Sequence, residues 1–149
     1  RVREPLAASS KERAMPAKSS AKKSAAKKST SLYVDGFVIP VPRSKLARYK
    51  AMARLGSEVW RDHGALSYHE CVADDVPVGK WTSFPRAVKL KEDEVVIFAW
   101  ITYASRKDRD RINKAVMADK RMHEFMKPGE VVFDGKRLIF GGFKEMVGW

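Results

Sequence analysis

Hydrophobic residues follow two periods along the chain, and these periods predict its strands and helices. Runs rich in β-branched and aromatic residues, which favour extended backbone, cover residues 33–41, 66–73, 95–103 and 137–143. Asp134 and Gly135 form a turn signal that predicts a hairpin between residues 131–133 and the last run. Gly141 and Gly142 indicate a bulge or a close backbone approach in that last strand.

Apolar residues at spacings of three and four predict two amphipathic helices. The first helix begins after Pro42 and Ser44 and ends at Gly64, a residue suited to the left-handed backbone beyond a helix C-terminus. The second helix begins at Ser105, an N-cap residue, and ends before Pro128. Their apolar stripes are Leu46, Tyr49, Ala53, Gly56 and Trp60 in the first helix, and Ile112, Ala115, Val116, Met122, Phe125 and Met126 in the second.

The order of elements is strand, helix, strand, strand, helix, strand, which predicts a ferredoxin-like βαββαβ domain of the α+β class with an antiparallel sheet. Residues 74–94 form a long irregular connection with a short element around residues 87–90. Connections of this length are uncommon in small domains and are often functional.

The third strand is apolar on both of its sides, although two helices cover only one face of a four-stranded sheet. One side carries Val95, Ile97, Ala99 and Ile101, and the other carries Val96, Phe98 and Trp100. The second face therefore needs a cover, and the same face of another copy is the simplest one. The sequence predicts a homodimer.

Charged residues are unevenly distributed along the chain. The formal net charge is +12, and the first 32 residues contain nine basic and two acidic side chains. Residues 14–31 offer almost only Ala, Lys, Ser, Met, Pro and Thr, so little apolar surface can offset the entropy of ordering them. The sequence predicts a disordered basic tail over residues 1–32 and one folded domain over residues 33–149. The tail is either a solvated leader or an arm that binds nucleic acid weakly through phosphates.

Residues 1–14 differ from the Lys/Ala repeat that follows, and codons for Lys11 and Glu12 can spell a bacterial ribosome-binding sequence six nucleotides ahead of Met15. We expect Met15 to be the native start and residues 1–14 to be translated leader or added sequence. The single cysteine, Cys71, fits a reducing compartment, and cytoplasm is the expected location. No apolar run approaches the roughly 20 residues of a membrane-spanning helix.

Three polar residues are candidates for acid–base chemistry. Asp35, His69 and Glu70 fall on strands that we expect to be adjacent in a mainly apolar sheet, where carboxyl and imidazole groups have shifted pKa values. The alternative is that they are strand-end or surface polar residues. His69 and Cys71 share a strand face, but a zinc site needs three or four protein ligands, so we expect no metal and no other cofactor.

Trp60, Trp81 and Trp100 are candidates for an aromatic pocket that receives a flat ligand. The alternative is that they are ordinary core residues. Both interpretations stay open on the sequence alone.

Several ordered blocks resemble one known family. They are Tyr33-Val-Asp-Gly-Phe37, Glu70-Cys-Val-Ala-Asp-Asp-Val-Pro-Val-Gly-Lys80, Val96-Ile-Phe-Ala-Trp-Ile101, Met117-Ala-Asp-Lys-Arg-Met122 and Phe133-Asp-Gly-Lys-Arg-Leu-Ile-Phe-Gly-Gly-Phe143. Over residues 33–147 the chain resembles the YbaA-like family, domain of unknown function 1428. The resemblance implies a dimeric α/β barrel similar to antibiotic-biosynthesis monooxygenases, and it carries over no catalytic residue.

Two functions are compatible with this sequence. The first is a barrel that binds a small organic molecule, with cofactor-independent oxygenase-type chemistry on a planar substrate as the reaction suggested by fold analogy. The alternative is a non-catalytic dimeric stress or interaction protein. An enzyme needs a pocket with polar groups, whereas an interaction module has no need of one.

Overall fold

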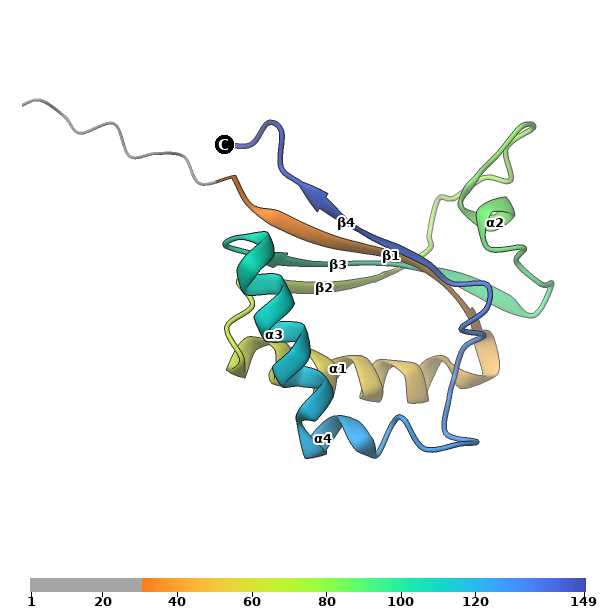
Figure 1. Cartoon of the computed structure of the whole chain (residues 1–149). Helices are drawn as coiled ribbons and strands as arrows, with labels where there is room; N and C mark the ends of the chain where they lie inside the picture. Colours follow the sequence, from red (N-terminus) through yellow and green to blue (C-terminus); the bar gives the residue numbers. More distant parts are fainter. Residues whose placement is uncertain (1–30) are drawn as a thin grey trace, which may run out of the picture.

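The computed structural model describes residues 31–149 (Figure 1). The predictions for the basic tail, its nucleic-acid contacts and the start at Met15 concern residues outside this range. The elements in chain order are β1 (Tyr33–Pro42), the 3-10 turn η1 (Arg43–Lys45), α1 (Leu46–Asp62), β2 (Ser67–Val72), α2 (Phe84–Ala87), β3 (Glu94–Tyr103), α3 (Arg106–Ala118), α4 (Lys120–His123) and β4 (Ile139–Lys144).

The four strands form one antiparallel sheet in the order β2-β3-β1-β4. With the helices between them, this confirms the predicted ferredoxin-like α+β fold. Helices α1 and α3 lie on the same side of the sheet (Figure 1). The helix-covered face and these two helices enclose most of the core, which includes Ile39, Val59, Ile97, Ile101 and Ile112.

Local signals explain the ends of the helices. The hydroxyl of Ser105 accepts a hydrogen bond from the backbone N–H of Asp108 at 3.0 Å and so caps α3, as predicted. Gly64 follows α1 with φ at 108°, in the left-handed region that favours glycine. The second predicted helix is interrupted at Asp119, whose extended backbone separates α3 from α4. The side chain of Asp119 then caps α4.

Two predictions about the last strand are wrong. Residues 131–133 form no strand, and β4 pairs with β1 instead of entering a hairpin. The carboxylate of Asp134 accepts a hydrogen bond from the backbone N–H of Lys136 at 2.9 Å, so the turn signal closes a local turn between irregular segments. The predicted bulge is also absent, because the β1–β4 register runs unbroken through Gly141 and Gly142. A close approach does occur at Gly142, but it is made by a side chain and not by backbone, since a Cβ atom there would collide with the Tyr33 hydroxyl.

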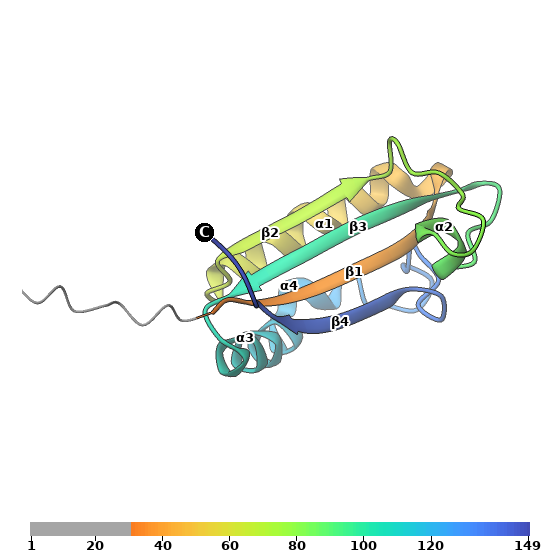
Figure 2. The ribbon, with the colours of Figure 1, turned by 90° about the horizontal axis from the view of Figure 1, so that it is seen from above.

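The other face of the sheet is largely uncovered. Figure 2 shows this face, with α2 over one end of it. There Val38, Val88 and Val96 form a small buried cluster. Further along, Phe98, Ile139 and Phe143 expose 44%, 45% and 62% of their surface. We call these three residues, with Trp100, the open apolar face.

Candidate functional site

A cavity of about 610 Å³ lies between the helix-covered face of the sheet and the helices. Its walls are mainly aromatic and thioether side chains from β1, α1, α3 and the segment between α3 and β4. Four methionines contribute to them, namely Met52, Met117, Met122 and Met126. Such walls are apolar and adaptable, which is typical of sites for small organic molecules.

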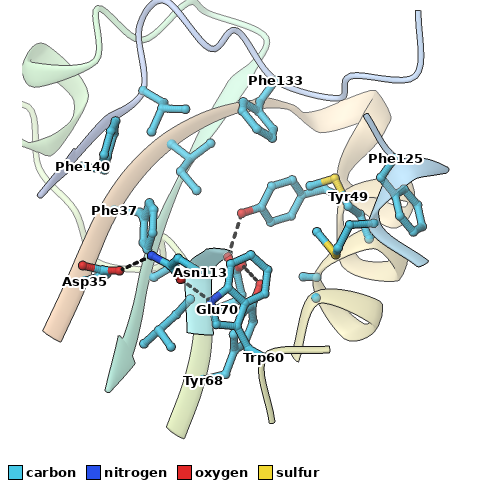
Figure 3. A pocket seen from close by; sticks show the side chains of 18 of the residues that line it. Asp35, Phe37, Tyr49, Trp60, Tyr68, Glu70, Asn113, Phe125, Phe133 and Phe140 are labelled. Atoms are coloured by element: carbon cyan, nitrogen blue, oxygen red, sulfur yellow. Dashed lines mark hydrogen bonds between the residues drawn. The ribbon is translucent and has the colours of Figure 1, made fainter. Parts of the chain in front are cut away.

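A carboxyl group from β2 faces this cavity. The hydroxyl of Tyr49 on α1 donates to Oε2 of Glu70 at 2.7 Å, and the hydroxyl of Tyr68 donates to Oε1 at 2.8 Å. Figure 3 shows both hydroxyl groups directed at the same carboxyl. One hydrogen bond to each oxygen holds the carboxyl in a single orientation.

The surroundings alter the proton affinity of these three groups. Burial raises the pKa of Glu70 above its usual value, and the two tyrosine hydrogen bonds, which favour the ionised form, offset only part of that rise. Burial and the neighbouring Glu70 also raise the pKa of Tyr49 and Tyr68. Both tyrosines therefore remain protonated donors at neutral pH, while the carboxyl can exchange a proton at a higher pH than an exposed glutamate.

A glycine in α1 makes room for this arrangement. A Cβ atom at Gly56 would lie 2.9 Å from the Tyr68 hydroxyl oxygen. The helix therefore approaches β2 closely at this point, although glycine in a helix interior costs stability. Any side chain at Gly56 would displace the hydroxyl that donates to Glu70.

A second polar group, centred on Asn113, also lines the cavity. Oδ1 of Asn113 accepts hydrogen bonds from the Trp60 indole at 3.0 Å and from the Tyr103 hydroxyl at 3.1 Å. Its amide nitrogen donates to Asp35 at 3.2 Å. Arg109 lies 3.5 Å from the other Asp35 oxygen, so the charge of this buried carboxylate is balanced. Figure 3 shows the Trp60–Asn113–Asp35 series.

The structure separates the three predicted acid–base residues. Asp35 and Glu70 both line the cavity, but β3 lies between their strands, so the expected adjacency is wrong. His69 also borders the cavity, but the residue is exposed and its ring stacks on Trp100, with centroids 4.8 Å apart, on the face opposite Glu70. Neighbouring residues of a strand point to opposite faces, and for that reason the imidazole is directed away from the Glu70 carboxyl.

The three tryptophans are likewise dispersed. Trp60 lines the cavity. Trp81 is 87% exposed in the β2–β3 connection, and Trp100 lies on the open apolar face. The aromatic walls come instead from residues that the sequence analysis did not select, among them Tyr49, Tyr68, Phe37, Phe125, Phe133 and Phe140. The spacing of Tyr68 and Glu70 on one strand was a usable signal, because residues two apart share a face.

The described part of the chain has neither a cluster of metal ligands nor a membrane-spanning helix. Among residues 31–149, no group of three or more His, Cys, Asp and Glu side chains is arranged to hold a metal ion. Within the same range, no helix has both the length and the apolar character needed to cross a membrane.

Comparison with known proteins gives a family match and a fold match. The model of the family described as "Protein of unknown function (DUF1428)" matches residues 32–135. The chain is 48% identical over 116 residues to the uncharacterized protein YbaA of Escherichia coli K12, an alignment that covers 77% of this chain and 97% of that protein. The Shigella flexneri protein of the same name matches to the same extent.

One solved structure shows a likeness of fold. A NIPSNAP family protein of unknown function from Agrobacterium tumefaciens superimposes with a TM-score of 0.52 at 15% identity, covering 78% of this chain and 89% of that one. PA3566 from Pseudomonas aeruginosa superimposes with a TM-score of 0.49 at 10% identity, covering 80% and 97%. At 15% identity, the likeness to the NIPSNAP family protein concerns the fold alone.

Proposed function

We propose that this chain, which belongs to the DUF1428 family of proteins of unknown function, binds a small organic molecule in the cavity between the sheet and helices α1 and α3. The observation that carries this proposal is the cavity itself. Its volume of about 610 Å³ is within the range of roughly 300–1,000 Å³ that is usual for small-molecule sites. A module that served only as an interaction surface would have no need of such a space.

Glu70 is the residue that we expect to contact the ligand. It lines the cavity, it is held by Tyr49 and Tyr68, and burial raises its pKa toward the range in which a carboxyl can accept and return a proton. General acid–base chemistry at Glu70 is therefore the reaction type that the site favours. The oxygenase-type reaction suggested by fold analogy stays a prediction, as does a cytoplasmic location.

The second candidate function is that of a dimeric interaction protein, and the open apolar face favours it. Phe98, Ile139 and Phe143 are large apolar side chains on this one face of the sheet, and each stays 44–62% exposed among residues 31–149, although Phe84 packs edge-on against Phe98. Such a patch is typical of an interface, and we propose that a second copy of this chain covers it. Ligand binding and dimerisation use opposite faces of the sheet, so both can hold.

A thermal-shift screen of small organic molecules against the full chain tests the binding proposal. Ligands of the cavity should raise the Tm. Ala53→Phe should abolish the shift, because Ala53 lines the cavity and a phenyl ring would fill part of it. Ala51→Phe on the exposed side of the same helix is the matched control and should keep the shift. A ligand-induced shift that Ala53→Phe leaves intact would place binding elsewhere.

A further inference from the structure

We infer that Glu70 receives the ammonium group of a cationic ligand whose apolar body fills the rest of the cavity. This inference rests on the proposed function and specifies the class of ligand. A carboxylate in apolar surroundings is stable when a positive group compensates it.

The other enclosed carboxylates of the domain have such a group. Asp35 is 4% exposed and pairs with Arg109 at 3.5 Å. Glu94 is 5% exposed and pairs with Arg137 at 2.5 Å. Glu70 has two neutral tyrosine hydroxyls and forms no ion pair with any residue from 31 to 149. A cationic ligand would supply the positive charge that no residue from 31 to 149 provides to Glu70.

The residues around Glu70 suit an organic cation. Tyr49 and Tyr68 donate to the carboxyl, and the ring of Trp60 lies 5.8 Å from that of Tyr68 at an interplanar angle of 47°. Aromatic side chains beside a carboxylate are the usual surroundings of bound ammonium groups, because ring faces attract cations. The remaining walls of the cavity are apolar and would bury a hydrocarbon body.

The charged groups elsewhere in the cavity do not oppose this assignment. Arg109 from α3 is the cation among the lining residues, and it lies between two acidic groups, at 3.5 Å from Asp35 and 3.0 Å from Asp110. Its charge is therefore balanced. An anionic ligand would have to displace one of these pairs and would also face Glu70.

Binding should be linked to a proton. When Glu70 is protonated in the free protein, the ammonium ion binds as the carboxylic acid releases its proton to solvent, leaving a carboxylate paired with the ammonium. The other titratable groups facing Glu70 are Tyr49 from α1 and Tyr68 from its own strand, whose raised pKa values keep them protonated at neutral pH. Asp35 and Arg109 remain paired. His69 is adjacent in sequence but lies on the other face, and it serves as a control.

Three probes with one naphthylethyl body test the inference by calorimetry on the full chain. They are naphthylethylamine, naphthylethanol and naphthylpropanoate. At neutral pH the amine should bind about tenfold more tightly than the alcohol, since a charge-assisted hydrogen bond replaces a neutral one. The propanoate should bind most weakly. Amine affinity should rise from mildly acidic to neutral pH with proton release, and His69→Gln should leave that profile unchanged.

One variant tests the charge of the Glu70 carboxyl, and a second tests a hydrogen bond that it accepts. Glu70→Gln should lower the amine affinity to that of the alcohol, while the affinity for the alcohol changes by less than about twofold. Tyr49→Phe removes one hydrogen bond that favours the carboxylate, so the rise in amine affinity should move to higher pH.

The outcomes distinguish this inference from the proposed function. Alcohol binding equal to or tighter than amine binding, lost in Ala53→Phe, would refute the ammonium assignment and leave the cavity as the binding site. A Glu70→Gln variant that still prefers the amine would do the same. No binding by any of the three probes, or binding that Ala53→Phe leaves intact, would instead contradict the proposed function.

Discussion

Arg137 and Glu94, 43 residues apart in the chain, form a two-point ion pair with N–O distances of 2.5 and 2.8 Å. The same guanidinium donates to the backbone carbonyl of Lys89 at 3.0 Å. One side chain therefore connects the start of β3, the connection that contains α2 and the segment leading into β4. That segment also forms a wall of the cavity, through residues such as Phe133 and Leu138.

Loss of this pair should destabilise the domain in a pH-dependent way. The Arg137 side chain holds the pKa of Glu94 in the folded protein below its usual value. The pair therefore stabilises the fold at a pH above the pKa that Glu94 has in the unfolded chain. This stabilisation is lost as the pH falls through the pKa that Glu94 has in the folded protein. Arg137→Met should lower the urea midpoint at neutral pH, and the difference from wild type should narrow in acid. Lys136→Met, at the exposed residue next to Arg137, should leave the urea midpoint nearly unchanged. Equal effects of the two variants would contradict this account.

The stability of Glu70→Gln relative to wild type should change with pH in the direction opposite to that of Arg137→Met. Burial raises the pKa of Glu70 in the folded protein. Ionisation of the wild-type residue therefore lowers the free energy of unfolding once the pH exceeds the pKa that Glu70 has in the unfolded chain. The loss is complete when the pH exceeds the pKa that Glu70 has in the folded protein. Relative to wild type, the variant should gain stability as the pH rises from acidic to neutral. Urea unfolding of both proteins across that range measures the trend. A constant difference would show that Glu70 titrates as it does in the unfolded chain.

A carboxylate at position 113 should destabilise the site. Asn113→Asp keeps the acceptor for Trp60 but loses the donor to Asp35 and adds a second negative charge beside it. We expect a loss of about 1–3 kcal/mol at neutral pH, the usual cost of an unsatisfied buried group. The loss should shrink in acid, where the introduced carboxyl group, once protonated, could again donate to Asp35. Urea unfolding that is unchanged at neutral pH would be incompatible with this network.

The open apolar face should carry the dimer contact. Light scattering of the wild type at micromolar concentration should give the mass of two chains. Phe143→Glu should give the mass of one, because it would bury a charge against an apolar partner surface. Ala51→Glu introduces the same charge on the exposed side of α1 and should leave the dimer intact. A monomeric wild type would refute the dimer proposal.

Much of the fold could be predicted from local patterns. Residues 95–103 are β-branched and aromatic and apolar in both alternating sets, which predicts a strand there, and β3 runs from Glu94 to Tyr103. Ser105 and Gly64 are suited to helix ends by their own chemistry, and both stand at such ends. The hairpin at Asp134 was wrong because a turn signal is local, whereas the partner of β4 is β1, about one hundred positions earlier in the chain.

The site divides in the same way between sequence and tertiary structure. The sequence determined that Tyr68 and Glu70 share a strand face and that His69 points away from it, because side chains alternate along a strand. Only the tertiary structure decided that this face looks into a cavity, that Tyr49 donates to Glu70 from a separate helix, and that Asp35 lies beyond β3. These relationships depend on how α1 packs over the sheet, and that packing is set by many distant contacts at once, so no short stretch of sequence encodes it.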